Sequence, residues 1–182
     1  MPVKWQHPNH VAGLSSNMKD WLLNTGSLTE RLQALTNHFA VNLLGQQSLD
    51  PDKSERSILT NCDNQEWQIR EVILQGKPLV QPENKNHPIS KDWVFARSVL
   101  PSQLCESQFV NLGNQPLGQR IFNDNQFVRS EFQIGQLQYH PLTHQPINIQ
   151  KPLWARRSKF KVEGLELIVA EAFLPDSPCY WS

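Results

Sequence analysis

Residues 153–174, LWARRSKFKVEGLELIVAEAFL, decide the fold class of this chain. Apolar side chains recur at alternate positions on both sides of the dipeptide Glu163-Gly164, which is the pattern of two strands joined by a tight turn. Two strands joined by so short a turn must pair with each other in antiparallel fashion. The stretch therefore predicts a β-hairpin near the C-terminus and an antiparallel sheet built around it.

The rest of the chain adds more strands and a few short helices. Further strand-like patterns occupy residues 39–47, 65–75, 92–100 and 127–137. Helices are expected from Ser15 or Ser16 to about Asn24, from Leu28 after the capping box Ser27…Glu30, after Pro101, and from Pro116 to near Phe122. The proline-containing stretches 76–91 and 138–152 are predicted to be loops.

Together these elements predict one α+β domain. Strands dominate and follow one another, while helices occur early and in the middle of the chain, which favours an antiparallel sheet with the helices on one side. A length of 182 residues suits one core. We expect a single domain over residues 1–182, with a sheet of about six strands and an N-terminal arm at residues 1–12.

The charge balance excludes several kinds of partner. The chain has 17 Lys and Arg against 17 Asp and Glu, so it offers no broad basic surface for nucleic acid or an anionic membrane. No run of about 18 apolar residues occurs, and the first ten residues, MPVKWQHPNH, lack the apolar core of a signal peptide. We expect a cytoplasmic protein without a membrane span that binds no nucleic acid.

The sequence also predicts that no metal ion or organic cofactor is needed. The cysteines Cys62, Cys105 and Cys179 are odd in number and have no CxxC spacing. His140 and His144 have a spacing that can bind metal, but they fall in a predicted loop with no acidic residue or cysteine near them. GxSxG, Walker and GxGxxG motifs are absent from the sequence.

Charged residues within apolar strand faces are the most informative feature of the sequence. Glu171 lies between Val169 and Phe173 on one face of the last predicted strand, and a buried carboxylate needs a partner. Arginines occur in the same way on other strands, at Arg70, Arg97 and Arg156.

Two interpretations of these charges remain open. If the strand faces converge, three arginines and one glutamate line a single pocket. Such a pocket suits a small anion with an apolar ring and a hydroxyl group, because guanidinium forms paired hydrogen bonds with a carboxylate. Alternatively, the same residues form structural ion pairs or lie on a solvent-facing surface. Spacing alone does not decide between the two.

Six blocks of sequence, taken together, resemble the chorismate lyase family. In chain order they are WLLNTGSLTERL at 21–32, WQIREVIL at 67–74, WVFARSVLP at 93–101, PLGQRIF at 116–122, LWARRSKF at 153–160 and VAEAFLPDSPCY at 169–180. Each block alone is a weak signal, whereas their combination over nearly the whole chain is specific. The resemblance implies a monomeric α+β protein with an internal ligand site beneath helical flaps.

The resemblance also implies a reaction and its residues. Members of the family convert chorismate to 4-hydroxybenzoate and pyruvate without a cofactor, and 4-hydroxybenzoate feeds quinone biosynthesis. The catalytic pair falls on Arg70, which meets the ring carboxylate, and on Glu171, which meets the ring hydroxyl. The other substrate-binding positions are the backbone of Leu28 and Leu117 and, for the enolpyruvyl carboxylate, Arg97 or Arg156.

Sensing without catalysis is the competing function. Effector domains of some transcription regulators resemble this fold and bind small ligands without transforming them. Such regulators carry a separate DNA-binding domain, whereas the family-like blocks use up these 182 residues and no basic recognition helix is present. We therefore expect an enzyme, a carbon–oxygen lyase, and keep a domain that senses small aromatic acids as the alternative.

Overall fold

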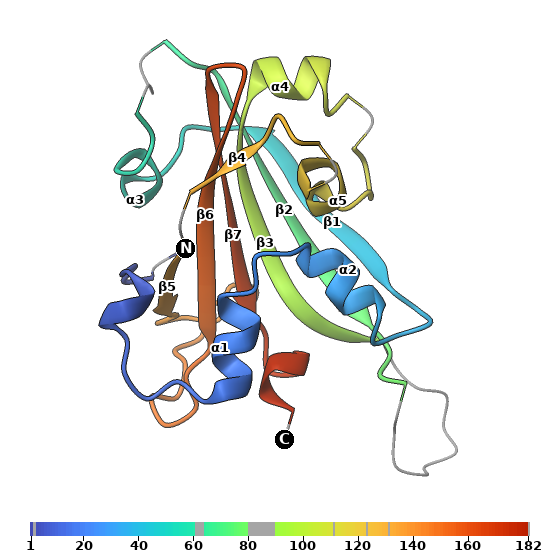
Figure 1. Ribbon diagram of the computed structural model, residues 1–182, viewed down its shortest axis with the longest axis vertical. Helices are drawn as coiled ribbons and strands as arrows, with labels where there is room; N and C mark the ends of the chain where they lie inside the picture. The colour runs from blue at the N-terminus through green and yellow to red at the C-terminus, as the bar shows by residue number, and fades with distance from the viewer. Residues whose placement is uncertain are drawn as a thin grey trace.

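A computed structural model shows one antiparallel sheet of seven strands in the order β1-β2-β3-β7-β6-β4, with β5 also paired to β6 (Figure 1). The strands are β1 (Ala40–Ser48), β2 (Trp67–Gly76), β3 (Lys91–Pro101), β4 (Val128–Arg129), β5 (Gln133–Gln136), β6 (Trp154–Val162) and β7 (Leu165–Phe173). The structure describes residues 1, 3–60, 64–79, 90–110, 112–122, 124–130 and 132–181, so Cys62 and most of the predicted loop 76–91 lie outside the described residues. The predicted fold class, a single α+β domain around an antiparallel sheet, is confirmed.

The predicted strand 127–137 forms two short strands, β4 and β5, instead of one. Both pair with β6, but three residues separate Arg129 from Gln133 while only two separate their partners Phe160 and Arg157. One extra residue on one side of a ladder breaks the regular pairing. Periodicity within the segment could not show this, because the partner strand sets the break.

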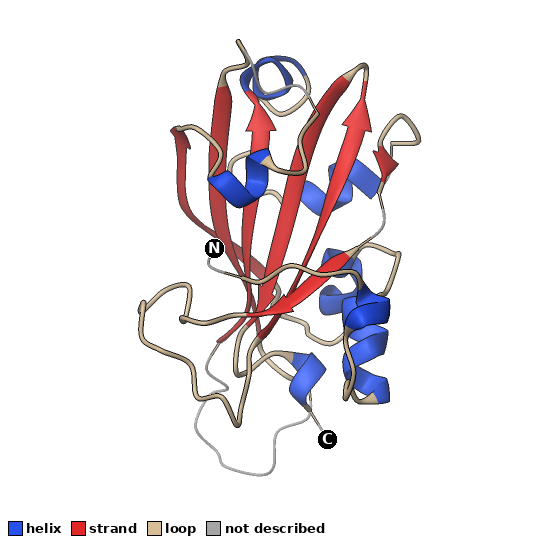
Figure 2. Cartoon of the chain, turned by 90° about the vertical axis from the view of Figure 1, so that its left-hand side faces the viewer, coloured by secondary structure: helices blue, strands red, loops and turns tan. Residues whose placement is uncertain are grey.

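Short helices pack on the sheet, and they are α1 (Ser16–Leu22), α2 (Leu28–Gln33), α3 (Lys53–Arg56), α4 (Ser102–Ser107) and α5 (Leu117–Phe122), with 3-10 turns at Pro8–His10 and Pro178–Tyr180. Helices α1, α2 and α5 lie in front of the sheet in Figure 1. The sheet is twisted, so its strands fan out in the quarter-turned view of Figure 2. None of the described helices is long and apolar enough to cross a membrane.

The starts of these helices follow local capping signals. Ser15 caps α1, and Ser27 Oγ accepts a hydrogen bond from the Glu30 N–H (3.3 Å), the half of the predicted capping box that the structure records. Helix α3, which the sequence analysis did not predict, begins with a complete capping box in which Asp52 and Glu55 exchange two hydrogen bonds of 2.8 Å. Its four residues are too few for a helical period to stand out in the sequence.

Strand register decides which charged side chains share a face. Directly paired residues of neighbouring strands point to the same side of a sheet. Arg70 pairs with Ser98 across β2 and β3, and Glu171 pairs with Ala96 on one side and Arg156 on the other. These side chains therefore all point toward the face that α1, α2 and α5 cover.

The N-terminal segment, predicted as an arm, runs beside β5. Val3 and Gln6 form isolated antiparallel bridges with Leu137 and Ile134. Its boundary at residue 12 stays a prediction.

Gly76 provides a test of the packing at the end of β2. A Cβ atom at Gly76 would lie 2.2 Å from ring atoms of Trp93, whose side chain is fully buried. Because the ring has no room to move, we expect Gly76→Ala to lower the free energy of unfolding by about 2 kcal/mol, measured by urea denaturation. Gly45→Ala is the matched control, since its new Cβ would lie 3.6 Å from Gln47 Nε2, an ordinary contact distance. Equal losses in the two variants would contradict the packing argument.

Candidate active site

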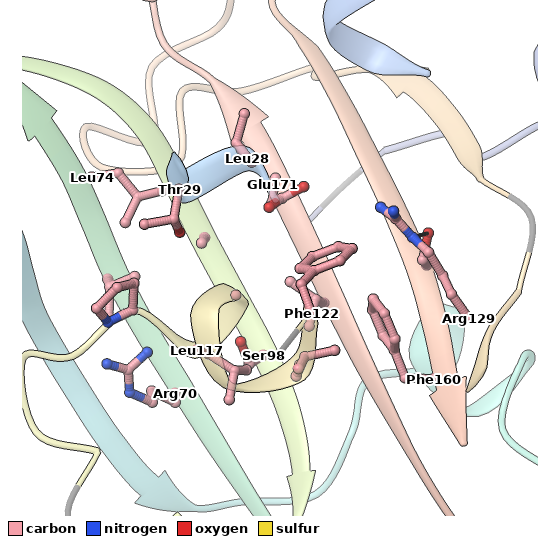
Figure 3. A pocket seen from close by; sticks show the side chains of 17 residues that line it. Leu28, Thr29, Arg70, Leu74, Ser98, Leu117, Phe122, Arg129, Phe160 and Glu171 are labelled. Atoms are coloured by element: carbon pink, nitrogen blue, oxygen red, sulfur yellow. Dashed lines mark hydrogen bonds between the residues drawn. The ribbon is translucent and has the colours of Figure 1, made fainter. Parts of the chain in front are cut away.

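A small cavity of about 40 Å³ lies between the sheet and helices α2 and α5. Its walls come from strands β2, β3, β6 and β7, and Figure 3 shows the lining side chains pointing into one space. The polar and charged groups of the lining include Thr29, Arg70, Ser98, Arg129, Ser158 and Glu171. Most of the remaining wall is apolar, so the cavity combines a few charges with a surface suited to a ring.

The first turns of α2 and α5 form the cover of the cavity. Leu28 and Leu117 are the first residues of these helices, and both line the cavity. Gly118 allows the two helices to approach closely, because a Cβ there would lie 3.1 Å from Thr29 Oγ1. Backbone N–H groups in a first turn have no acceptor within their own helix. Leu28 and Leu117, whose backbone was expected to bind substrate, thus both lie at the cavity.

Arg70 is a buried cation without an anionic partner in the described structure. Its side chain is 1% exposed, and one of its terminal nitrogens donates to the carbonyl oxygens of Gly113 (2.9 Å) and Gln115 (3.0 Å). The Nε atom is buried and has no hydrogen-bond partner among the described residues. Burial lowers the pKa of Arg70, and the nearby Cys105 opposes this only in part. A bound anion would stabilise such a guanidinium group by balancing its charge and accepting its hydrogen bonds.

Glu171 enters the cavity from β7 and is held by an arginine behind it. The Nε atom of Arg156 donates to Glu171 Oε2 at 2.6 Å. The same guanidinium group donates to the carbonyl oxygens of Trp21 (3.1 Å) and Asn24 (3.0 Å). Arg156 is 1% exposed and does not line the cavity. It therefore fixes the Glu171 carboxylate and ties the end of α1 to the sheet.

The structure does not bring Arg97 to the cavity, so the interpretation in which three arginines line a single pocket does not hold. Arg97 pairs with Glu71 across β2 and β3 and points to the opposite face of the sheet. There its guanidinium group binds Glu55 (2.7 Å) and Glu71 (2.8 Å). Burial alone would lower the pKa of Arg97, but these two carboxylates raise it above its usual value. For Arg97 the structural ion-pair interpretation holds.

Arg129 lines the cavity near Glu171, and the sequence analysis missed it. Its guanidinium group lies 3.9 Å from the ring centre of Phe132, and its Nε donates to Ser158 Oγ at 3.2 Å. The available signal was the alternation of Phe127 and Arg129, which resembles the pattern that singled out the other arginines.

Within the described ranges, no cluster of three or more His, Cys, Asp and Glu side chains could hold a metal ion. The His140 Nδ1 atom accepts a hydrogen bond from the Leu142 N–H at 3.3 Å, a local turn contact.

Comparison with known proteins gives a consistent result. A family model described as chorismate lyase matches residues 1–182. A probable chorismate pyruvate-lyase from Pseudoalteromonas atlantica is 38% identical, over 98% of this chain and 90% of that protein. The chorismate pyruvate-lyase of Pectobacterium carotovorum is 30% identical, over 93% of this chain and 83% of that protein.

A solved structure with a similar fold is the effector domain of PhnF from Mycobacterium smegmatis. Its TM-score is 0.52 at 13% sequence identity, over 83% of this chain and 90% of that domain, and this likeness concerns the fold alone. Family membership is shown by two other findings. These are the match to the family model and the sequence identity to the two lyases. On these grounds the chain belongs to the chorismate lyase family, a family of carbon–oxygen lyases.

Proposed function

We propose that this protein converts chorismate to 4-hydroxybenzoate and pyruvate and so supplies an aromatic precursor for quinone biosynthesis. In this reaction the ether bond between ring carbon 3 and the enolpyruvyl oxygen breaks, and the ring loses the hydrogen on carbon 4, which carries the hydroxyl. The enolpyruvyl fragment gains a proton on its methylene carbon and becomes pyruvate. The ring becomes aromatic, so much of the driving force belongs to the substrate.

The observation that carries this proposal is the buried Arg70 guanidinium group beside a cavity with apolar walls. It has no carboxylate partner among the described residues, and its Nε atom lacks a hydrogen bond. A ring carboxylate would supply both the missing charge and the missing acceptor. The backbone N–H groups at Leu28 and Leu117 add donors on the same cover.

The distance across the sheet suits a ligand with a second polar group opposite its carboxylate. Arg70 is on β2 and Glu171 on β7, with only β3 between them, so their backbones are about 10 Å apart across the strands. Both side chains point to the covered face of the sheet, so a ring that lies over β3 could meet Arg70 on one side and Glu171 on the other. Glu171 then faces the hydroxyl on carbon 4, where hydrogen loss occurs.

These residues contribute to catalysis by geometry and charge. Holding the ring carboxylate and the hydroxyl fixes the ring, and complementary charge favours the transition state over the free substrate. Helices α2 and α5 cover the site from the side opposite the sheet. We further propose that the enzyme acts without a cofactor, as a monomer, in the cytoplasm. The sensing alternative is not favoured, since the curated relatives cited above are chorismate pyruvate-lyases.

The direct test of the proposal is to incubate the purified protein with chorismate and to quantify both products. We expect 4-hydroxybenzoate, followed by its absorbance, and pyruvate, followed by a coupled reductase, to form in equal amounts. Binding of 4-hydroxybenzoate without any conversion of chorismate would instead support the sensing function.

Replacing Arg70 tests its role as the ring-carboxylate site. We expect Arg70→Ala to weaken 4-hydroxybenzoate binding by about 2 kcal/mol, or about 30-fold, because a desolvated charge-assisted pair is lost. Isothermal titration calorimetry measures this change. Arg56→Ala removes a half-exposed arginine on α3 that does not line the cavity and serves as the control. Unchanged product affinity in folded Arg70→Ala would remove Arg70 from the site.

Replacing Glu171 separates proton transfer from orientation of the hydroxyl. Glu171→Gln keeps the size and one acceptor oxygen but cannot exchange a proton at working pH. If the carboxylate takes part in proton transfer, kcat should fall by about 100-fold while product affinity changes less. If it only orients the hydroxyl, both quantities should fall modestly.

Glu166→Gln is the matched control for that experiment. Glu166 lies on the same strand but points to the other face, where it pairs with Lys159 at 2.9 Å. A folded Glu171→Gln protein with wild-type turnover and product affinity would leave Glu171 only a structural partner of Arg156.

A further inference from the structure

Chorismate carries two carboxylates, and the proposed function leaves one of them without a binding group. The ring carboxylate is on carbon 1, and the enolpyruvyl carboxylate hangs from the ether on carbon 3. Carbon 3 is the neighbour of carbon 4, which bears the hydroxyl. If Arg70 holds the ring carboxylate and Glu171 faces the hydroxyl, the second carboxylate lies beside Glu171, at the end of the cavity away from Arg70.

The two arginines expected at this place from the sequence are both engaged elsewhere. Arg97 lies on the opposite face of the sheet between Glu55 and Glu71. Arg156 is fully buried, and its charge is already matched by Glu171. Neither lines the cavity.

Arg129 differs from both, because it borders two spaces at once. It lines the small cavity under α2 and α5, and it also lines a more open depression of about 780 Å³ next to it. Phe122 and Phe160 border both spaces as well, and Figure 3 shows their rings beside the Arg129 side chain. A substituent attached to the ring near Glu171 would extend past Arg129, Phe122 and Phe160 from the cavity into the depression.

The guanidinium group of Arg129 has neutral partners and no ion pair within the described part of the chain. Nε donates to Ser158 Oγ (3.2 Å), and one terminal nitrogen donates to the carbonyl oxygen of Thr25 (3.0 Å). Burial, with a further contribution from the nearby charge of Arg156, lowers the pKa of Arg129 to about 10, while Glu171 opposes the shift. The group therefore stays positive at neutral pH and lacks a matching anion.

Three aromatic rings hold this cation in position. The guanidinium carbon lies 3.9 Å from the ring centre of Phe132, 5.0 Å from that of Phe122 and 5.4 Å from that of Phe160. A planar guanidinium group stacks on such rings, and a lysine ammonium group does not reproduce that contact together with the two directed hydrogen bonds. The side chain is thus arranged before any ligand arrives.

We infer that Arg129 binds the enolpyruvyl carboxylate of chorismate, and that the adjoining depression receives this side chain and is the way out for pyruvate. The inference rests on the proposed function. When the bond between carbon 3 and oxygen breaks, its electron pair goes to the enolpyruvyl fragment. Negative charge therefore grows on the side of the ring where Arg129 lies, and the cation favours the breaking of this bond.

The test uses three stable aromatic ligands that differ only at carbon 3. These are 4-hydroxybenzoate, 4-hydroxy-3-methoxybenzoate, and 3-(carboxymethoxy)-4-hydroxybenzoate, which carries a carboxylate through an ether as chorismate does. In the wild type we expect the carboxymethoxy compound to bind more tightly than the methoxy compound. In Arg129→Met this preference should fall by about tenfold or more, while 4-hydroxybenzoate affinity changes less than about threefold. The KM for chorismate should rise in parallel.

Two further variants control for charge and for folding. Arg120→Met removes one positive charge from an exposed position on α5 outside the cavity lining, and it should leave the ligand preference unchanged. Arg129→Lys keeps the charge and most of the side-chain volume, so it remains usable if Arg129→Met does not fold. We expect it to retain part of the preference for the carboxymethoxy compound and to bind chorismate less tightly than the wild type.

The outcomes separate this inference from the proposed function. If the wild type converts chorismate but Arg129→Met and Arg129→Lys keep the wild-type preference and KM, the role of Arg129 is overturned and the proposed function stands. An equal loss of affinity for all three ligands in both variants would also overturn it, since it would indicate a general disturbance of the cavity. If the wild type neither converts chorismate nor binds 4-hydroxybenzoate, the proposed function itself fails.

Discussion

The alternation of side chains along paired strands is the constraint on which the site depends. Each residue on β2, β3, β7 and β6 belongs to one of two faces, and the register of the four strands decides which residues share a face. A shift of one residue in any of these pairings would move a whole set of side chains to the other side. Arg70 and Glu171 share a space because two consecutive registers agree, β2 with β3 and β3 with β7, and the helices only close the space that the sheet has defined.

The sequence predicted the parts of this arrangement that are local. Alternation along single strands put Arg70 and Glu171 on apolar strand faces, and the structure lines the cavity with both residues and with Val72, Leu74 and Val169 from the same faces. Alternation within one strand could not show which side of the sheet Arg97 occupies, because that depends on the register between neighbouring strands.

Other elements were missed for related reasons. Register is set by contacts between segments far apart in the chain, and no pattern within one segment reports it. The four-residue helix α3 and the split of strand 127–137 also depend on partners. Arg129 carried the same kind of signal as the other arginines, but without the fold nothing set it apart from other arginines in the sequence.

Charge compensation divides four of the strand arginines into two groups with different consequences. Arg97 and Arg156 have carboxylate partners within the chain and serve the architecture. Arg70 and Arg129 have only neutral acceptors among the described residues. A desolvated cation without an anion costs folding free energy. The chain retains two of them around one cavity, and this is the electrostatic arrangement that a dianionic ligand would complete.

The cover made of α2 and α5 has a consequence for the dynamics of the chain. Each helix has six residues, and where they meet, a hydrogen bond of 3.1 Å joins Gln119 to Gln33. Helices this short have little stability of their own. Their amides should exchange with deuterium through local opening, whereas amides in the central strands β3 and β7 exchange only on global unfolding. A ligand held from both sides would slow exchange in the cover and leave the sheet unaffected, so the exchange rates of these two short helices would report whether the site is occupied.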